Sequence, residues 1–205
     1  RALVDRVLQH QEPTTWAKTA ADLGCGAGCS GIAFRSCVEH MIGVDLSPEM
    51  VDKARQRNCY DELVVGNVEC VLRRQPKHLK KCTNPNHGLL ASRSFHLVFS
   101  CNTFCYIKDL RSVFDDIRQI MIPNDGIFAF TTEIFDQDRD DNDGGLDSND
   151  KPYALQSCAR YAHKRWYLEE SIQEFGFETK AFEMTPLHRK HNGRDVYSVM
   201  VILTV

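Results

Sequence analysis

Short apolar runs and helically spaced apolar residues alternate along the first two thirds of the chain. A short apolar run that stops at a glycine or an acid is typical of a buried strand. On this basis, strands are predicted at residues 19–23, 41–44, 63–65, 95–100 and 127–132. Helices are predicted at residues 1–10, 48–57, 68–73 and 110–122. Because strands and helices alternate, the pattern predicts a parallel sheet.

The last third of the chain follows a different pattern. A helix is predicted at residues 167–175 and ends at Gly176. Apolar runs at residues 177–187 and 196–205 flank an Asn-Gly pair at residues 192–193, which is a hairpin signal. The predicted fold class is therefore α/β: a Rossmann-like, seven-stranded, mostly parallel sheet with helices on both faces and a C-terminal antiparallel hairpin.

Two polar segments interrupt the single predicted domain, which spans residues 1–205. Residues 75–93 are rich in lysine and contain proline, so we expect a surface insertion. Residues 136–150 are acidic and cannot bury an apolar face, so we expect a mobile loop. His78, Cys82 and His87 have a spacing that metal ligands use, but they lack a clear fourth ligand. No metal site is therefore predicted.

Charge and cysteine usage narrow the class of protein. The chain has 25 Lys+Arg against 28 Asp+Glu, a formal net charge of -3, so no nucleic-acid partner is expected. Its nine cysteines lack the spacing of a disulfide framework, and no apolar run is long enough for a membrane helix. We expect a cytoplasmic protein without membrane contact. An organelle is the alternative, because the chain begins with Arg and we expect a preceding segment.

A glycine-rich turn and one acid carry the candidate chemistry. The turn Asp22-Leu-Gly-Cys-Gly-Ala-Gly28 follows the strand predicted at residues 19–23, and glycines there let a ligand approach the backbone closely. Asp45 ends the next strand, where a carboxylate can accept hydrogen bonds from both hydroxyls of a ribose. The plainer alternative is a tight turn together with a helix-capping acid.

The same turn also satisfies a dinucleotide fingerprint. Residues 26–31 read G-x-G-x-x-G, so an NAD(P)-dependent oxidoreductase is a rival function. The first glycine of this match stands later after the strand than is usual, and no second mononucleotide-binding half follows. This interpretation stays the alternative.

Two motifs resemble those of class I S-adenosylmethionine (SAM) dependent methyltransferases. Residues 21–28, Ala-Asp-Leu-Gly-Cys-Gly-Ala-Gly, resemble motif I of that family, and residues 43–50, Gly-Val-Asp-Leu-Ser-Pro-Glu-Met, resemble its motif II region. Residues 60–66, 95–110 and 160–163 resemble a family of predicted methyltransferases whose bacterial members often carry N-terminal tetratricopeptide repeats. No such repeat is present in this chain.

The resemblance implies a SAM site, with S-adenosylhomocysteine (SAH) as the product, and a role for each matching position. It places the acid and the turn of the first motif around the methionine part of the cofactor, Asp45 on the ribose, and Leu46 and Met50 against the adenine. It places Asn67 and Val68 at the adenine edge, with Asn67 in place of the usual acid. The remaining cofactor-binding residues that it implies are Asp22, Gly24, Cys25, Gly26, Gly28, Cys101 and Asn102.

Methyl transfer from a sulfonium needs alignment more than it needs a general base. Where a base is required, histidine suits neutral pH, and His163 is the first candidate. Tyr106 and Tyr161 are candidates for orienting the acceptor. We expect a small-molecule acceptor rather than a protein. A SAM-binding scaffold without turnover is an alternative, and the sequence leaves the oligomeric state open.

Overall fold

The computed structural model describes residues 2–7, 15–73, 86–135, 151–191 and 194–205. Its strands are β1 (Ala17–Leu23), β2 (Val38–Asp45), β3 (Glu62–Val65), β4 (Leu97–Ser100), β5 (Ile127–Phe135), β6 (Tyr153–Leu155), β7 (Tyr161–His163), β8 (Glu178–His191) and β9 (Arg194–Thr204). Its helices are α1 (Ala2–Val7), α2 (Cys29–Phe34), α3 (Pro48–Arg55), α4 (Val68–Leu72), α5 (Arg111–Ile120) and α6 (Arg165–Glu174), with short 3₁₀ turns η1 (Arg35–Cys37) and η2 (Phe104–Tyr106).

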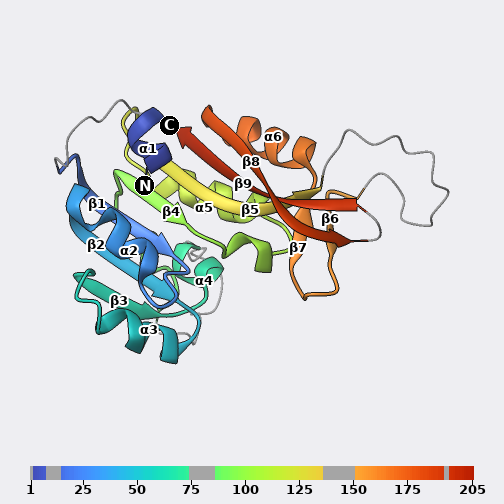
Figure 1. Ribbon diagram of the computed structural model, residues 1–205. Coiled ribbons are helices and arrows are strands. Elements are labelled where there is room, and N and C mark those ends of the chain that lie inside the picture. The colour runs from blue at the N-terminus through green and yellow to red at the C-terminus, as the bar shows by residue number, and fades with distance from the viewer. Residues whose placement is uncertain (1, 8–14, 74–85, 136–150, 192–193) are drawn as a thin grey trace, which may run out of the picture.

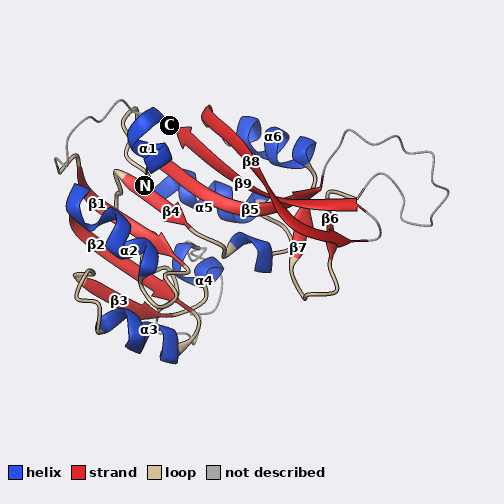
Figure 2. Cartoon of the chain, viewed as in Figure 1, coloured by secondary structure: helices blue, strands red, loops and turns tan. Residues whose placement is uncertain are grey.

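All the strands belong to one sheet (Figure 1, Figure 2). The first five run in the order β3-β2-β1-β4-β5, and each neighbouring pair is parallel. β9 pairs antiparallel with β5, and β8 pairs antiparallel with β9. The predicted Rossmann-like α/β fold with a C-terminal antiparallel hairpin is thereby confirmed.

The two faces of the sheet bury separate apolar clusters, because successive side chains of a strand point to opposite faces. In β5, Phe128 and Phe130 join the cluster that is covered by α4, α5 and α6. Ile127 and Ala129 join the cluster on the other face, which includes residues of α1, α2 and η1. Helices therefore lie on both faces, and the sheet edge formed by the strand ends is left for the loops.

A second hairpin, β6–β7, was not predicted. The end of β5 extends past β4, and its Glu133 and Ile134 pair in parallel with Ala162 and His163 of β7. β6 pairs antiparallel with β7. Each of these strands has only three residues, which is too short for an apolar alternation to stand out in the sequence. The described sheet consequently has nine strands rather than the predicted seven.

Part of the predicted surface insertion belongs to the core. In the described residues 86–93, Leu90 is fully buried, and its backbone N–H donates to the carbonyl of Val71 on α4. The prediction of a surface segment is therefore wrong for this part, because the apolar run 89–91 was outweighed by the lysines before it. Residues 75–85 and the predicted mobile loop at 136–150 lie outside the described residues, as do the candidate metal ligands His78 and Cys82.

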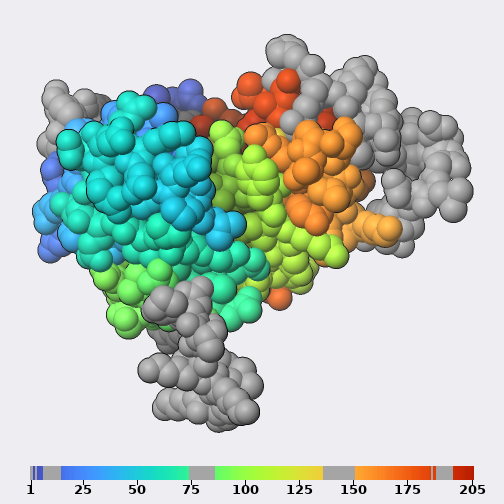
Figure 3. Space-filling model, turned by 90° about the horizontal axis from the view of Figure 1, so that it is seen from below, coloured from blue at the N-terminus to red at the C-terminus, as the bar shows by residue number. Residues whose placement is uncertain are grey.

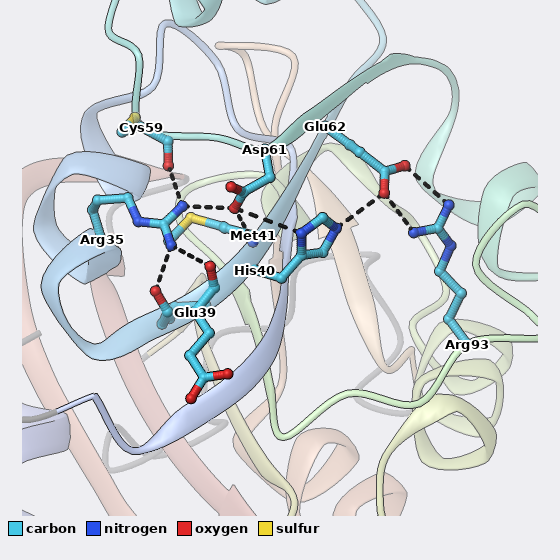
Figure 4. A network of polar contacts seen from close by, with 9 residues as sticks. Arg35, Glu39, His40, Met41, Cys59, Asp61, Glu62 and Arg93 are labelled. Carbon is cyan, nitrogen blue, oxygen red and sulfur yellow. Dashed lines mark hydrogen bonds and ion pairs between the residues drawn. The ribbon is translucent and has the colours of Figure 1, made fainter.

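A polar network lies at the opposite edge from the glycine turn, where β2 and β3 begin (Figure 4). Arg35 donates to Asp61 at 2.7 Å, and Arg93 binds both oxygens of Glu62 at 2.9 Å. His40 lies between these two acids, with its Nε2 3.0 Å from Glu62. These pairs hold the pKa of Glu62 below its ordinary value and link β2, β3 and the segment before β4.

Within the described residues, no helix has the length and apolar character needed to span a membrane.

Candidate functional site

The glycine turn lies between β1 and α2 and has three residues with positive φ. Gly24, Gly26 and Gly28 have φ of 80°, 52° and 86°, which residues with a Cβ rarely adopt. The backbone N–H groups of Gly24 and Cys25 both donate to the carbonyl of Val44, at 2.8 and 2.9 Å. The turn is thus fixed against the end of β2, next to Asp45.

Asp45 joins the end of β2 to the turn. Its Oδ2 accepts from the N–H of Gly26 at 2.8 Å, and its Oδ1 accepts from the N–H of Ser47 at 2.9 Å. A carboxylate has about four lone-pair positions, so one remains on each oxygen for another donor. The two hydroxyls of a ribose are suitable donors. The alternative role for Asp45 was to cap the following helix. Ser47 is the residue that caps α3, because its side chain accepts from the N–H of Met50.

Asp22 is a fully buried carboxylate with one unpaired oxygen. Its Oδ2 accepts from the hydroxyls of Ser30 at 2.6 Å and Tyr60 at 2.7 Å. Its Oδ1 has no partner within the described part of the chain. Burial raises the pKa of Asp22 to about 7, and the two hydroxyl donors oppose that rise. An oxygen left in this state at a glycine turn is ready for a donor or cation from a ligand.

Two glycines of the turn differ in the space around them: Gly24 is in close contact with protein atoms, and Gly26 faces open space. A Cβ on Gly24 would lie 1.9 Å from Oγ1 of Thr103, so Gly24 is needed for close contact with the loop after β4. A Cβ on Gly26 would meet nothing within 4 Å. An adenosyl sulfonium fits this place. Gly26 leaves room for it, and Asp45 has lone pairs for further donors. Asp22 has a carboxylate oxygen without a partner among the described residues.

Of the four residues assigned to the adenine, Val68 is buried in the core, and the other three are at least partly exposed. Leu46 is 70% exposed, which is unusual for a large apolar residue, and Met50 is half-buried. Asn67 caps α4, because its Oδ1 accepts from the N–H groups of Glu69 at 2.8 Å and Cys70 at 3.3 Å. Its amide N–H groups are therefore the part left for an adenine edge. Val68 is buried in the core at 7% exposure.

The loop after β4 is fixed from two sides. Thr103 donates from Oγ1 to the carbonyl of Gly24 at 3.3 Å, and the N–H of Asn102 donates to Oγ1 of Thr131 on β5 at 2.8 Å. Asn102 has a φ of 59°, in the left-handed region. Solvent reaches Cys101, but surrounding protein atoms, and then Asp22, raise the pKa of its thiol to about 11. Burial likewise raises the pKa of Cys25, so both thiols stay protonated at neutral pH.

The predicted acceptor residues come from η2 and the β6–β7 hairpin. Tyr106 of η2 is 57% exposed, and the guanidinium of Arg160 lies over its ring at 5.3 Å. Tyr161 is half-buried and packs against Tyr153, with ring centroids 6.1 Å apart. Arg160 also pairs with the buried carboxylate of Glu133 at 3.1 Å. The structure thus brings Tyr106 and the hairpin together, next to the loop that contacts Gly24.

His163 lies in a different setting from the one a general base needs. The side chain is fully buried, its Nε2 is 3.1 Å from the carbonyl of Ile107, and its Nδ1 is 3.3 Å from Oγ1 of Thr132. Burial lowers the pKa of His163 to about 4, so it is neutral at pH 7. Neutral imidazole can donate to Ile107 and accept from Thr132 at once. With both nitrogens used, the geometry gives no support to the prediction of a general base.

Several residues that contact the candidate site were not identified from the sequence. Tyr60 donates to Asp22, accepts from the N–H of Gly31, and would clash at 2.3 Å with a Cβ on Gly31. The signal for this contact was a glycine inside the helix after the turn, which was counted only as part of the dinucleotide fingerprint. Thr103, Thr131 and Glu133 carry no recognisable motif.

These features define an α/β protein with a nucleoside-cofactor site at the carboxyl ends of its first two strands. A family model described as "Methyltransferase domain" matches residues 21–130, which is more than half of the chain. The chain therefore belongs to this methyltransferase family, and its cofactor is S-adenosyl-L-methionine. The comparison decides against the oxidoreductase alternative. No curated protein matches the chain.

Solved structures share the fold over nearly the whole chain. A SAM-dependent methyltransferase from Clostridium acetobutylicum has a TM-score of 0.60 at 14% identity, covering 97% of this chain and 88% of that one. The YcgJ protein from Bacillus subtilis gives 0.63 at 12% identity, with 98% and 97% covered. Magnesium protoporphyrin IX methyltransferase from Synechocystis, with bound SAM, gives 0.57 at 11% identity, with 98% and 76% covered. At these identities the likeness shows the fold alone.

Proposed function

We propose that the chain transfers a methyl group from SAM to a small-molecule acceptor, with Asp45 holding the ribose hydroxyls. The observation that carries the proposal is the combination at the glycine turn: an open Gly26, a carboxylate at Asp45 with lone pairs to spare, and a buried Asp22 with an unpaired oxygen. A turn with a purely structural role would need none of these three features. The likeness to the family with tetratricopeptide repeats stays a prediction.

Each end of the cofactor has residues that suit it. The exposed Leu46 and the half-buried Met50 supply apolar contact for the adenine ring. Asn67 uses its oxygen in the helix cap, so its amide would donate to an adenine ring nitrogen instead of accepting from the amino group. Asp22 and the glycine turn would lie around the methionine part. Val68 would act only by supporting α4 from the core.

When bound, SAM supplies an electrophilic methyl group on a sulfonium. The chain's own residues then need to place the acceptor atom in line and keep water out. η2 packs against β5 and β7, so the exposed Tyr106 and the half-buried Tyr161 are positioned to orient an acceptor. The exposed ring of Tyr106, beside η2 and the hairpin, is where we expect a small-molecule acceptor to bind.

Proton removal is left to the acceptor itself or to solvent. His163 has no free nitrogen, and the nearby thiols Cys25 and Cys101 have raised pKa values that keep them protonated. Protonated thiols are poor nucleophiles, so they would not compete with the acceptor for the methyl group. We infer that His163 is a positioning residue, which connects β7 to β5 and to the segment after η2.

Titration calorimetry with SAM and SAH tests the proposal. The unmodified chain should bind both, and Asp45→Ala should bind at least about tenfold more weakly because two charge-assisted hydrogen bonds are lost. Asp52→Ala is the matched control, since this exposed carboxylate on α3 pairs with Arg55 of the same helix. Equal affinities for the Asp45→Ala and Asp52→Ala variants would remove Asp45 from the site. A screen with labelled SAM then identifies acceptors and separates an enzyme from a scaffold without turnover.

A further inference from the structure

The acceptor side of the site carries a cation whose position is fixed by several contacts. Arg160 stands immediately before β7, where the tight turn from β6 ends: the N–H of Gln156 donates to the carbonyl of Arg160 at 2.8 Å. Ala159 in this turn has a φ of 59°. A non-glycine residue in the left-handed region costs about 1 kcal/mol, so surrounding contacts have to maintain the turn.

Glu133 supplies those contacts. Its side chain is 5% exposed, and its two oxygens accept separately, one from Arg160 at 3.1 Å and the other from the amide of Gln156 at 2.7 Å. One buried carboxylate at the end of β5 therefore holds both ends of the turn. Because its two oxygens are already engaged, Glu133 is poorly placed to be the group that meets a ligand.

The Arg160 guanidinium keeps contact with solvent. Its side chain is 35% exposed, and its central carbon lies 5.3 Å from the ring centre of Tyr106, which is itself 57% exposed. The pair with Glu133 uses one of the five N–H donors of the fork, and a side-chain hydrogen bond with Tyr106 uses another. Donors that are fixed in place and reached by solvent lose little entropy when they bind an anion.

This cation lies one turn away from the cofactor loop. The N–H of Tyr106 donates to the carbonyl of Thr103 at 2.9 Å, and Thr103 contacts Gly24 of the glycine turn. A 3₁₀ turn rises by about 2 Å per residue, so Tyr106 stands within roughly 6 Å of Thr103 along the turn. From below, the cyan and blue N-terminal part, the yellow-green segment after β4 and the orange hairpin lie side by side on one surface (Figure 3).

The β6–β7 hairpin also exposes an apolar side chain, on the face opposite to Arg160. Leu155 is 56% exposed and stands opposite Tyr161 in the β6–β7 register, so the two side chains share one face of the hairpin. That face also carries Tyr153 and His163, and His163 contacts the carbonyl of Ile107 just after η2. Arg160 precedes Tyr161 and lies with Glu133 and Ala162 on the other face of the hairpin, so it is the exposed ring of Tyr106, and not Leu155, that accompanies the guanidinium.

We propose that Arg160 binds a carboxylate on the methyl acceptor, and that the exposed ring of Tyr106 contacts the acceptor's apolar body. This inference rests on the proposed function and names the substrate class for the same site. Glu133 neutralises part of the guanidinium charge, so the remaining charge matches a monoanionic carboxylate better than a phosphate dianion. A guanidinium fork also matches the planar geometry of a carboxylate.

Matched small acids and amides test the proposal on the SAH-saturated protein. Binding of phenylacetate, phenylacetamide, octanoate, octanamide and phenyl phosphate is followed by NMR titration. Each acid should bind at least about tenfold more tightly than its amide. Equal binding of acids and amides, or no measurable binding of either acid, overturns the proposal. Phenyl phosphate binding about tenfold more tightly than phenylacetate overturns the assignment of a carboxylate.

Variants decide whether Arg160 carries this preference. Arg160→Gln should abolish the acid preference, and Arg160→Lys should retain part of it, since the charge stays while the fork is lost. The double variant Glu133→Gln/Arg160→Gln removes the buried lone carboxylate that could disturb folding, and it should lose the preference as well. Arg165→Gln is the control, because that arginine lies on α6 and pairs with Glu169. A preserved preference in both Arg160→Gln variants overturns the proposal.

SAH affinity, measured first, separates this proposal from the proposed function. If SAH fails to bind the unmodified chain, the proposed function fails and this inference fails with it. If SAH binds but acids and amides do not differ, only the assignment of the acceptor fails. All Arg160 variants should bind SAH within about twofold of the unmodified chain, which also shows that they fold.

Discussion

Acids at opposite ends of the parallel strands lie in contrasting environments. At the start of β2 and β3, Asp61 and Glu62 are partly exposed and paired with Arg35 and Arg93 (Figure 4). Near the end of β1, the Asp22 carboxylate is fully buried, has only hydroxyl donors and keeps one oxygen unpaired. The arginines lower the pKa values of Asp61 and Glu62, whereas burial raises the pKa of Asp22.

The comparison separates a structural network from a binding site. Carboxylates at a sheet edge that already pair with arginines have less to offer a ligand, and exposed ion pairs contribute little to stability. A buried acid without a cation costs stability, and the fold retains it beside a turn that has room for a ligand. Such unsatisfied groups concentrate where function needs them.

The pH dependence of stability gives the largest expected contrast. The pKa of Asp22 rises from 3.8 to about 7, so its stabilising contribution is present at low pH and is lost as pH rises through 7. At roughly 1.4 kcal/mol per unit of pKa, the loss is about 4 kcal/mol at most. The pKa values of Asp61 and Glu62 are lowered, so their contribution is lost as pH falls. Urea unfolding from about pH 2 to 8 measures both contributions.

Asp22→Asn sharpens that contrast. The variant should lose the fall in stability between pH 4 and 7, while Glu62→Gln should keep it. If the free energy of unfolding of the parent and of Asp22→Asn changed with pH in the same way, Asp22 would not titrate in the folded protein as described.

Tyr60→Phe should have the next largest effect. The variant removes the hydroxyl that donates to Asp22 and accepts from Gly31, and leaves both partners buried without it. The expected loss is about 2 kcal/mol in the free energy of unfolding. Tyr106→Phe, at an exposed ring, is the control and should change stability by less than about 0.5 kcal/mol. Equal stabilities for the two variants would show that the Tyr60 hydroxyl has no structural role.

Gly26→Ala should separate binding from folding. The added Cβ meets no protein atom, so the cost to folding is limited to the strain of a positive φ, about 1 kcal/mol. Because that Cβ enters the side left open for a ligand, SAH affinity should fall at least about tenfold in calorimetry. An unchanged SAH affinity in a well-folded variant would contradict the assigned cradle.

Arg93→Gln should have the smallest effect. The ion pair with Glu62 is partly exposed, so its loss should cost less than about 1 kcal/mol and should leave SAH affinity unchanged. Thermal unfolding in low and high salt checks this, because salt screens such pairs. A large loss of SAH binding would mean that the two ends of the sheet are coupled.

Much of the fold follows from local patterns in the sequence. The alternation of strands and helices, the Ser47 cap and the glycine at 176 all reflect short-range physics, and the structure has them where they were predicted. The glycine turn and Asp45 were found for the same reason, since a ligand cradle needs residues that are close in sequence or spaced by one strand-helix unit.

The acceptor side could not be predicted in this way. β6 and β7 are too short for periodicity, and Glu133 binds residues 23 and 27 positions away along the chain. The sequence shows His163 as a titratable residue, but its burial between Ile107, Thr132 and Tyr167 depends on tertiary packing. Contacts made only when distant segments meet leave no local signal.

A crystal structure of the SAH complex tests the central claim most directly. The account predicts that both ribose hydroxyls lie within hydrogen-bond distance of the Asp45 carboxylate, that the adenine contacts Leu46, and that the amino acid part lies on the open side of Gly26. SAH bound elsewhere on the chain, or bound with its ribose away from Asp45, would contradict it.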